Sequence, residues 1–240
     1  MKLTLATIDR WIEKREPHYV CVTGVHGVME SQKDPKLKVI HNNAGLVTPD
    51  GMPLVWLSRL RGFSHVERVY GPDLMLALCE HGLAHRYRHF LYGGGDGVAD
   101  KLKDSLKKRS DGINIVGTYT PPFRNLTAEE DAHVVKIINQ AQPDIVWVGL
   151  STPKQELWMA EHQSKLDASV LIGVGAAFDF NAGLKLQSPR WMQKSGLEWF
   201  FRLISEPRRL WRRYLINNPV FVTLVIAQLL GIKKFDSGQS

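Results

Sequence analysis

The feature that most constrains the fold of this chain is the alternation of short apolar runs with longer amphipathic stretches. The apolar runs that have the length of β-strands lie at 18–23, 88–92, 113–117, 144–149 and 169–174. The stretches that have helical periodicity lie at about 72–86, 97–109, 127–141 and 153–166. Strands that alternate with helices form βα units, in which successive strands run parallel. The sequence therefore predicts an α/β fold with a mostly parallel sheet flanked by helices.

Two of the predicted helices begin with residues that cap helix N-termini. Thr127 precedes Glu130 by three residues, and Thr152 precedes Gln155 by three residues, with Pro153 between them. This spacing is typical of a capping box, and proline is favoured at the first helical position. Small or polar residues follow each strand, and in an open α/β sheet the loops at the carboxyl ends of the strands bind ligands.

The excess positive charge of the chain lies in its last fifth. Between Pro189 and Lys234 there are nine lysines and arginines but only two acidic residues, Glu198 and Glu206. This excess equals the formal net charge of the whole chain, +7, so the remaining residues are neutral in sum. Such an asymmetry favours an anionic partner, which is a phosphate group, a nucleic acid or a membrane surface.

The same segment has no strand pattern and is predicted to be helical. A basic helix is expected over 207–217, with Pro219 ending or kinking it, and an apolar run of about 13 residues follows at 220–232. That run is shorter than the roughly 20 residues that span a membrane. Two interpretations stay open. The segment either lies in a membrane interface, or forms a helical hairpin that packs its apolar face on the α/β core and leaves its arginines in solvent.

The cysteines and the N-terminus indicate the compartment. Cys21 and Cys79 each lie inside an apolar segment, which favours buried thiols over a disulfide. The first 16 residues lack the long apolar run and cleavage site of a signal peptide. We therefore expect a cytoplasmic protein.

Several loops carry residues that could bind a phosphorylated ligand. Gly93, Gly94 and Gly95 lie between a strand and a helix, where glycines let the backbone approach a phosphate. Val98 replaces the third glycine of a dinucleotide fingerprint, which favours a tight structural turn, although a sugar nucleotide could still use this loop. Lys154, at a helix start, is expected to point into the ligand crevice, and Asp179 follows the last strand.

The dipeptide Asp50-Gly51 also has two interpretations. Asp-Gly is a common turn, because glycine accepts positive φ. It also lies where a helix begins after a short apolar segment, which is a suitable place for a carboxylate that takes a proton.

Motifs for other chemistries are missing from the sequence. There is no D-x-D triplet, Walker A loop, C-x-x-C pair, H-E-x-x-H or G-x-S-x-G. If the chain is an enzyme, the sequence predicts that it works without a metal and without a serine nucleophile, and we expect no cofactor.

Together these stretches resemble the WecG/TagA/CpsF family of bacterial glycosyltransferases (glycosyltransferase family 26). The resemblance covers nearly the whole chain and rests on PDGMPLVW (49–56), ERVYGPDLM (67–75), LYGGGDGVADKL (91–102), PDIVWVGLSTPKQELWM (143–159), IGVGAAFDFNAG (172–183) and GLEWFFRLISEPRRLWRRYL (196–215). It implies a Rossmann-like catalytic domain over 1–188 and a basic helical appendage over 189–240 that docks on the inner face of the cell membrane.

The resemblance also implies a reaction and its residues. Members transfer a sugar from a UDP-sugar to a polyprenyl-diphosphate-linked sugar, with inversion, in cell-surface polysaccharide synthesis. The family's base corresponds to Asp50, and its other active-site residues correspond to Thr23, Arg68 and Gln155. The residues expected to contact substrate are Gly51, Asp73, Gly93, Gly94, Gly95, Lys154, Glu156, Asp179, Arg202, Arg208, Arg209 and Arg212.

Alternatives concern both the class of protein and the donor. An NAD-dependent oxidoreductase would need the missing third glycine and gives the basic segment no role. A module that binds RNA or DNA would use the interleaved arginine and tryptophan, but the adjoining apolar run favours lipid over nucleic acid. Within the family, Val25 and Ser151 depart from the usual residues. The donor therefore stays open between UDP-N-acetylmannosamine, its uronic acid and a UDP-hexose such as UDP-glucose.

Overall fold

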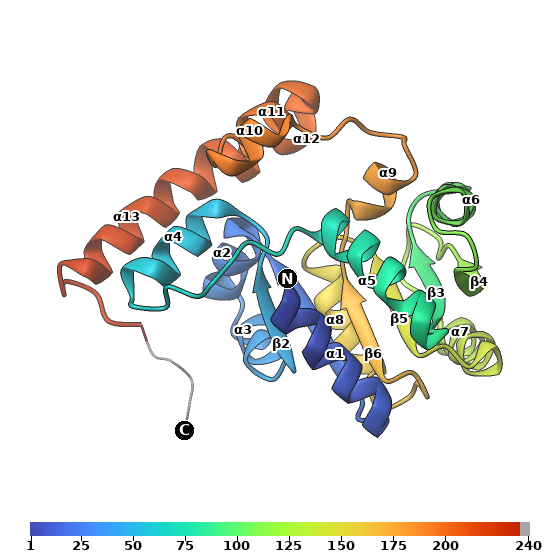
Figure 1. The fold of residues 1–240 in the computed structure, drawn as a ribbon. Helices are drawn as coiled ribbons and strands as arrows, with labels where there is room; N and C mark the ends of the chain where they lie inside the picture. The colour runs from blue at the N-terminus through green and yellow to red at the C-terminus, as the bar shows by residue number, and fades with distance from the viewer. Residues whose placement is uncertain (236–240) are drawn as a thin grey trace. The chain divides into compact units, whose positions relative to one another are not determined.

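A computed structural model describes residues 1–235 of the chain (Figure 1). Its contacts divide the chain into two compact units. Unit 1 contains residues 1–22, 44–48 and 69–186, and unit 2 contains 23–43, 49–68 and the chain from Gln187 onward. The domain boundary expected at residue 188 stays a prediction, and the last five residues of the expected appendage, 236–240, lie outside the described residues.

Unit 1 is built on a six-stranded parallel sheet with the strand order β2-β1-β6-β5-β3-β4. The strands are β1 (His18–Thr23), β2 (Leu46–Pro49), β3 (Arg88–Gly93), β4 (Asn114–Tyr119), β5 (Ile145–Gly149) and β6 (Val170–Gly173). The strand order and the parallel pairs confirm the α/β, Rossmann-like fold. Five strands lie within two residues of their predicted bounds, whereas the short strand β2 was not predicted.

Helices flank this sheet in unit 1. They are α1 (Lys2–Lys14), α5 (Gly71–His85), α6 (Val98–Arg109), α7 (Ala128–Ala141), α8 (Lys154–His162) and α9 (Ala177–Asn181). The four predicted helices are present, although α8 ends four residues before the predicted end. Helices α1 and α9 were not predicted.

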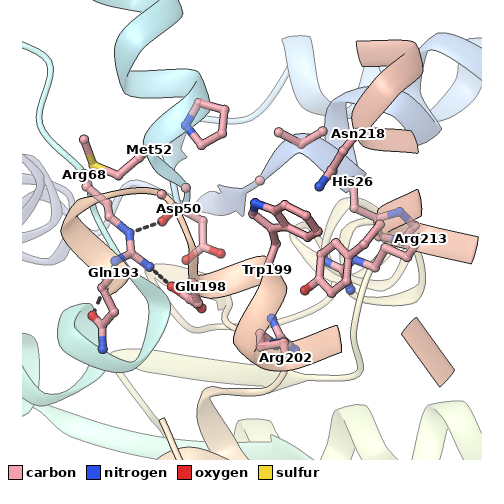
Figure 2. A pocket seen from close by; sticks show the side chains of 16 residues that line it. His26, Asp50, Met52, Arg68, Gln193, Glu198, Trp199, Arg202, Arg213 and Asn218 are labelled. Carbon is pink, nitrogen blue, oxygen red and sulfur yellow. Dashed lines mark hydrogen bonds and ion pairs between the residues drawn. The ribbon is translucent and has the colours of Figure 1, made fainter. Parts of the chain in front are cut away.

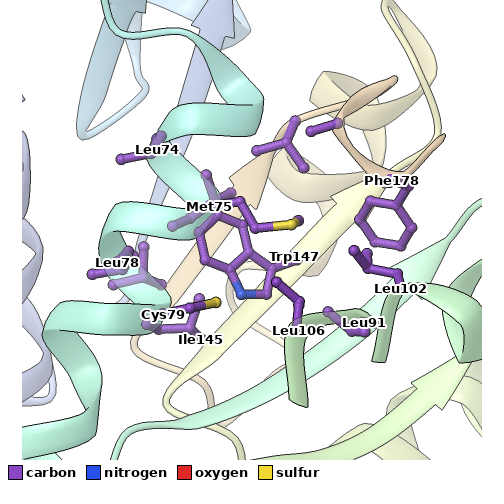
Figure 3. Close-up of a cluster of buried hydrophobic side chains, with 14 of the residues drawn as sticks. Leu74, Met75, Leu78, Cys79, Leu91, Leu102, Leu106, Ile145, Trp147 and Phe178 are labelled. Atoms are coloured by element: carbon purple, nitrogen blue, oxygen red, sulfur yellow. The ribbon is translucent and has the colours of Figure 1, made fainter. Parts of the chain in front are cut away.

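One face of the sheet packs on α1, α5 and α6. Trp147, at the centre of β5, is fully buried among apolar side chains of α5 and α6 (Figure 3). Side chains alternate between the two faces of a strand, so Ile145 and Trp147 point to this face together. Cys79 lies in the same cluster and Cys21 is also buried, and both are free thiols as predicted.

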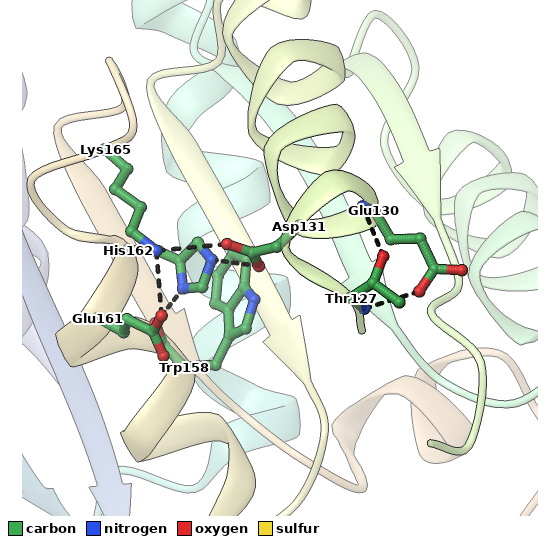
Figure 4. A network of polar contacts seen from close by, with 7 residues as sticks. All are labelled: Thr127, Glu130, Asp131, Trp158, Glu161, His162 and Lys165. Carbon is green, nitrogen blue, oxygen red and sulfur yellow. Dashed lines mark hydrogen bonds and ion pairs between the residues drawn. The ribbon is translucent and has the colours of Figure 1, made fainter. Parts of the chain in front are cut away.

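The opposite face is held by stacked rings and a polar network. Tyr92 follows Leu91 of the first face, and its ring stacks on Trp158 at 4.2 Å. Trp158 stacks in turn on His162, whose Nε2 lies 2.8 Å from Asp131 (Figure 4). At the start of α7, Thr127 accepts a hydrogen bond from the Glu130 N–H, and the Glu130 carboxylate accepts one from the Thr127 N–H. The predicted capping box of α7 is therefore confirmed.

The second predicted cap is wrong. Helix α8 begins at Lys154 with Pro153 as its N-cap, and no side chain caps it. Ser151 has a φ of +66°, which turns the chain sharply before Thr152. The Thr152 hydroxyl donates to the Glu156 carboxylate at 2.8 Å instead of accepting from a helix N–H.

Unit 2 is helical in its described residues. Its elements are α2 (Val25–Lys33), α3 (Pro35–Asn42), α4 (Met52–Leu60), α10 (Arg190–Lys194), α11 (Glu198–Ser205), α12 (Pro207–Trp211), the π-helical turn η1 (Arg212–Ile216) and α13 (Asn217–Leu229). Pro219 does not end the basic helix, because the boundary lies at Asn217. Pro219 is the third residue of α13, which continues directly from the π-helical turn η1.

Helix α13 packs on α2 through one side only. Phe221 is buried, whereas Val222, Ile226 and Leu229 are about half exposed. The apolar face of α13 is thus only partly covered within unit 2. Among residues 1–235, no helix combines the length and apolar character needed to cross a bilayer.

Candidate functional site

A cavity in unit 2 brings together residues from three separate parts of the chain (Figure 2). It is an open cavity, with about 620 Å³ of empty space when the solvent at its mouth is included. The residues that line it are Gly24, Val25, His26, Asp50, Gly51, Met52, Pro53, Arg68, Gln193, Gly196, Glu198, Trp199, Arg202, Arg213, Tyr214 and Asn218.

Asp50 enters the cavity from the turn between β2 and α4. Its N–H donates to the carbonyl of Thr23, the last residue of β1, at 2.9 Å. A Cβ placed on Gly24 would lie 3.8 Å from Asp50 Oδ2, so the carboxylate lies close beside that glycine. Gly51 is the N-cap of α4 with a φ of −112°, an extended conformation open to any residue. This dipeptide therefore does not use the positive φ of a glycine turn.

Arg68 is held by three partners in the cavity. Its Nε donates to the backbone carbonyl of Asp50, and one terminal nitrogen forms an ion pair with Glu198 of α11. The other terminal nitrogen donates to Gln193 Oε1 at 3.4 Å. The Arg68 and Glu198 side chains are 14% and 15% exposed, so the ion pair is largely shielded from water.

Thr23 is not among the residues that line the cavity. Its side chain is buried, and Oγ1 lies 3.2 Å from His41 Nε2. The other ring nitrogen of His41 lies 3.0 Å from the Leu37 carbonyl, which fixes the imidazole. The structure therefore connects Thr23 to Asp50 through the backbone.

Positive charge faces the carboxylates inside the cavity. Burial raises the pKa of Glu198, and the neighbouring Asp50 raises it further, whereas Arg68 and Arg202 oppose the rise. Burial lowers the pKa of the Arg213 guanidinium, and the charge of Asp50 opposes this change. The three arginines and both carboxylates line the same cavity, so the charge of each acts on the others.

His26 belongs to the same environment. Burial, followed by Arg213, lowers the pKa of His26 to about 4, and Glu30 acts in the opposite direction. His26 Nδ1 lies 3.3 Å from Asn217 at the start of α13. The imidazole is therefore neutral at physiological pH and adds no charge to the cavity.

Three of the arginines expected to contact substrate lie outside this cavity. Arg209 pairs with Glu206 at 2.6 Å, and the guanidinium carbon of Arg212 lies 5.2 Å from the centre of the Trp211 ring. Arg208 is exposed. Of the predicted appendage arginines, Arg202 alone is among the residues that line the cavity.

The remaining predicted residues belong to unit 1. They are Gln155, Asp73, Gly93, Gly94, Gly95, Lys154, Glu156 and Asp179. Gln155 and Glu156 are buried and hydrogen bonded to each other at 3.1 Å, while Gln155 Oε1 and Glu156 Oε2 have no hydrogen-bond partner among residues 1–235. Asp179 forms an ion pair with Lys185 at 3.0 Å. The roles of these residues stay predictions.

Sequence reasoning missed several residues of the cavity. Glu198, Gln193, Trp199 and Arg213 line it, yet none was expected there. One signal was available for Glu198, because it is one of only two acids in the basic segment. A carboxylate kept among so many cations indicates a specific partner, which the structure identifies as Arg68.

The fold and the cavity define a class of protein before any comparison. A parallel α/β sheet, combined with a cavity where carboxylates face arginines, fits an enzyme that transfers a group from a phosphorylated donor. In the part of the chain that the structure describes, no three His, Cys, Asp or Glu side chains are grouped as a metal site.

The chain belongs to the glycosyl transferase WecG/TagA/CpsF family, whose sequence model matches residues 1–235. This finding confirms the resemblance inferred from the motifs. Similar proteins are named N-acetylglucosaminyldiphosphoundecaprenol N-acetyl-beta-D-mannosaminyltransferase. The protein from Bacillus subtilis is 30% identical over 85% of this chain and 77% of its own length. The protein from Bacillus spizizenii is 29% identical over 82% and 74%, and that from Staphylococcus aureus is 28% identical over 80% and 73%.

Proposed function

We propose that this chain transfers N-acetylmannosamine from a UDP donor to an N-acetylglucosaminyl-diphosphate-polyprenol acceptor, with inversion at the anomeric carbon. The names of its relatives support this donor sugar and this acceptor. The observation that carries the proposal is the position of Asp50, a carboxylate that lines an open cavity together with three arginines.

Asp50 acts as the general base in this reaction. An acceptor hydroxyl oxygen attacks the anomeric carbon, and the bond from that carbon to the UDP oxygen breaks. The proton of the hydroxyl passes to the Asp50 carboxylate. One displacement gives inversion, so a single base is sufficient. The hydrogen bonds from the Asp50 N–H to Thr23 and from Arg68 to the Asp50 carbonyl hold the backbone of the base in place.

Arg202 and Arg213 stabilise the negative charge that develops on the leaving diphosphate. Both line the cavity, and Arg213 is a partly buried cation whose Nε has no hydrogen-bond partner among residues 1–235. Fixed cations that are partly shielded from solvent stabilise developing charge more strongly than cations in bulk water do. The diphosphate group is the substrate feature that matches them.

The C-terminal segment places the enzyme on an anionic membrane surface at the inner face of the cell membrane, where the polyprenyl acceptor resides. Exposed basic side chains lie in α12 and η1, and exposed apolar side chains lie in α12, η1 and α13. They include Trp211, Leu215, Ile216, Val222, Ile226, Leu229, Arg208 and Arg212. An element with this combination lies in the interface between head groups and acyl chains.

Release of UDP with a panel of donors tests the reaction. UDP-N-acetylmannosamine, its uronic acid and UDP-glucose are each incubated with and without a short-chain polyprenyl-diphosphate-N-acetylglucosamine. We expect acceptor-dependent release with UDP-N-acetylmannosamine, and a product whose anomeric configuration is opposite to that of the donor. If UDP-glucose were turned over faster than UDP-N-acetylmannosamine, the proposed donor sugar would be wrong, but the proposed class of reaction would stand. A product with retained configuration would exclude a single displacement by the acceptor hydroxyl in which Asp50 acts only as the base.

Vesicle flotation tests the membrane surface separately. Wild type and the Arg208→Gln/Arg212→Gln variant are mixed with vesicles that contain either anionic or only zwitterionic lipids. We expect the wild type to float with anionic vesicles, with binding that weakens as salt rises, and the variant to bind less. Equal binding to both kinds of vesicle would contradict the electrostatic part of the proposal.

A further inference from the structure

We propose that Glu198 is a positioning residue that orients Arg68, so that Arg68 fixes the backbone of Asp50. This inference rests on the proposed role of Asp50 as the base. It gives α11 a task in the chemistry that is distinct from membrane contact and from binding of the diphosphate.

The contacts form a chain from α11 to the base. Glu198 is the first residue of α11, and its carboxylate pairs with a terminal nitrogen of Arg68. The Nε of the same guanidinium donates to the Asp50 carbonyl (Figure 2). Because a guanidinium is planar and rigid, fixing one edge of it fixes the direction of its other donors. Glu198 therefore determines where the Arg68 Nε points.

A second contact supports the same orientation. Gln193 Oε1 accepts from Arg68, while Gln193 Nε2 donates to the Ser188 carbonyl at 2.8 Å and so holds the amide in place. Glu198 and Gln193 reach Arg68 from two successive helices, α11 and α10. The contact with Glu198 joins two opposite charges, whereas the contact with Gln193 joins a cation to a neutral amide at 3.4 Å, so Glu198 contributes more to the orientation than Gln193.

The ion pair also separates the tasks of the cavity arginines. The charge of Arg68 is balanced by Glu198, and both side chains are largely buried. A paired cation attracts a diphosphate less than a cation without such a carboxylate. Arg213 has no ion pair among the described residues and lies in the same cavity, so it suits the leaving group better. Arg68 is thereby assigned to the base.

The experiment compares Glu198→Gln with Glu206→Gln. Glu206 is the other acid of the basic segment and pairs with Arg209 outside the cavity, so its variant is a matched control. We expect Glu198→Gln to lower kcat by roughly 10- to 100-fold, because small displacements of a catalytic group cost about this much. The KM of the donor should stay within about threefold of its wild-type value. Glu206→Gln should retain the wild-type kcat.

Hydrogen exchange provides a readout that needs no turnover. The Asp50 amide donates to the Thr23 carbonyl, so a loosened Asp50 backbone should exchange faster. We expect peptides that cover 46–54 to exchange roughly tenfold faster in Glu198→Gln than in wild type, and at the wild-type rate in Glu206→Gln. If the wild type shows no transferase activity, the proposed function fails, yet this measurement still tests the link from Glu198 to Asp50.

A double-mutant cycle shows whether Glu198 acts through Arg68. The variant that combines Glu198→Gln with Arg68→Gln should lose no more activity than Arg68→Gln alone. If Glu198→Gln does not fold, Glu198→Asp retains the charge at a shorter reach and should give intermediate exchange over 46–54. Additive losses in the cycle, or unchanged exchange at Asp50 in the folded variant, would overturn the proposal.

Discussion

Replacing Gly93 by alanine should destabilise the sheet of unit 1. Gly93 is the last residue of β3, with a φ of +124°. A Cβ at this position would lie 2.7–2.8 Å from the backbone carbon, nitrogen and oxygen of Gly149, its neighbour in β5. These are backbone atoms, so neither strand relieves the contact by moving a side chain.

The magnitude has two parts. Holding a residue with a Cβ at such a φ costs about 1–3 kcal/mol. Inserting a methyl group into a well-packed core costs about 1–3 kcal/mol more. The expected loss is therefore about 2–6 kcal/mol, a large part of the roughly 5–15 kcal/mol that stabilises a typical domain. For a chain of this size each kcal/mol lowers the melting temperature by about 2–4 °C.

Gly112→Ala is the matched control for this measurement. Gly112 also has a positive φ, +82°, but a Cβ there meets no atom within 4 Å. Both variants restrict the unfolded chain equally, so the difference between them in thermal or urea unfolding isolates the contact. A Gly93→Ala protein as stable as Gly112→Ala, but with weakened binding of UDP, would refute the packing argument. It would favour the interpretation in which Gly93 lets the backbone approach a phosphate.

Three further predictions concern the fold. Thr127→Ala removes the hydroxyl that caps α7 and should lower the free energy of unfolding by about 0.5–2 kcal/mol, whereas Thr127→Ser should leave it nearly unchanged in urea titrations. Burial raises the pKa of Cys79 to about 12 and also raises that of Cys21. Iodoacetamide at about pH 8 should therefore label both thiols only after unfolding, and rapid labelling of the native protein would contradict their burial. Burial lowers the pKa of His89 to about 4 from 6.5, so as the pH falls this histidine is protonated in the unfolded chain before it is protonated in the folded protein. The free energy of unfolding should therefore be highest above pH 6.5 and fall as the pH drops towards 4, by at most about 1.4 kcal/mol per pH unit. A urea midpoint of wild type that does not fall over this range would contradict the assignment.

The fold of unit 1 follows largely from local sequence patterns. Its buried strands are apolar runs, as in Ile145–Gly149, and the capping box at Thr127 depends on residues three positions apart. Such signals are visible in a single sequence because the interactions that produce them are local. The cap expected at Thr152 was wrong because the prediction considered only the spacing of neighbouring residues. The turn at Ser151 directs the Thr152 hydroxyl to Glu156, and no spacing rule reveals this.

The cavity depends on contacts between distant parts of the chain. Arg68 meets Glu198 across 130 positions, and His26 meets Asn217 across 191. Periodicity does not predict such pairs, because they arise from how helices of unit 2 pack on one another. Asp50 and Arg68 were expected from the family resemblance and do lie together. The assignment of Glu198 required the structure.

The most direct test of the central claim compares wild type with Asp50→Asn in acceptor-dependent UDP release, with EDTA present throughout. Asparagine keeps the shape of the side chain and removes the carboxylate that takes the proton. Equal binding of UDP by both proteins, together with equal hydrogen exchange over 46–54, would show that the cavity is intact. We predict turnover by wild type in EDTA and a loss of about 100-fold or more in Asp50→Asn. Equal turnover by the two proteins would contradict the account and leave Asp50 as a residue of the turn before α4.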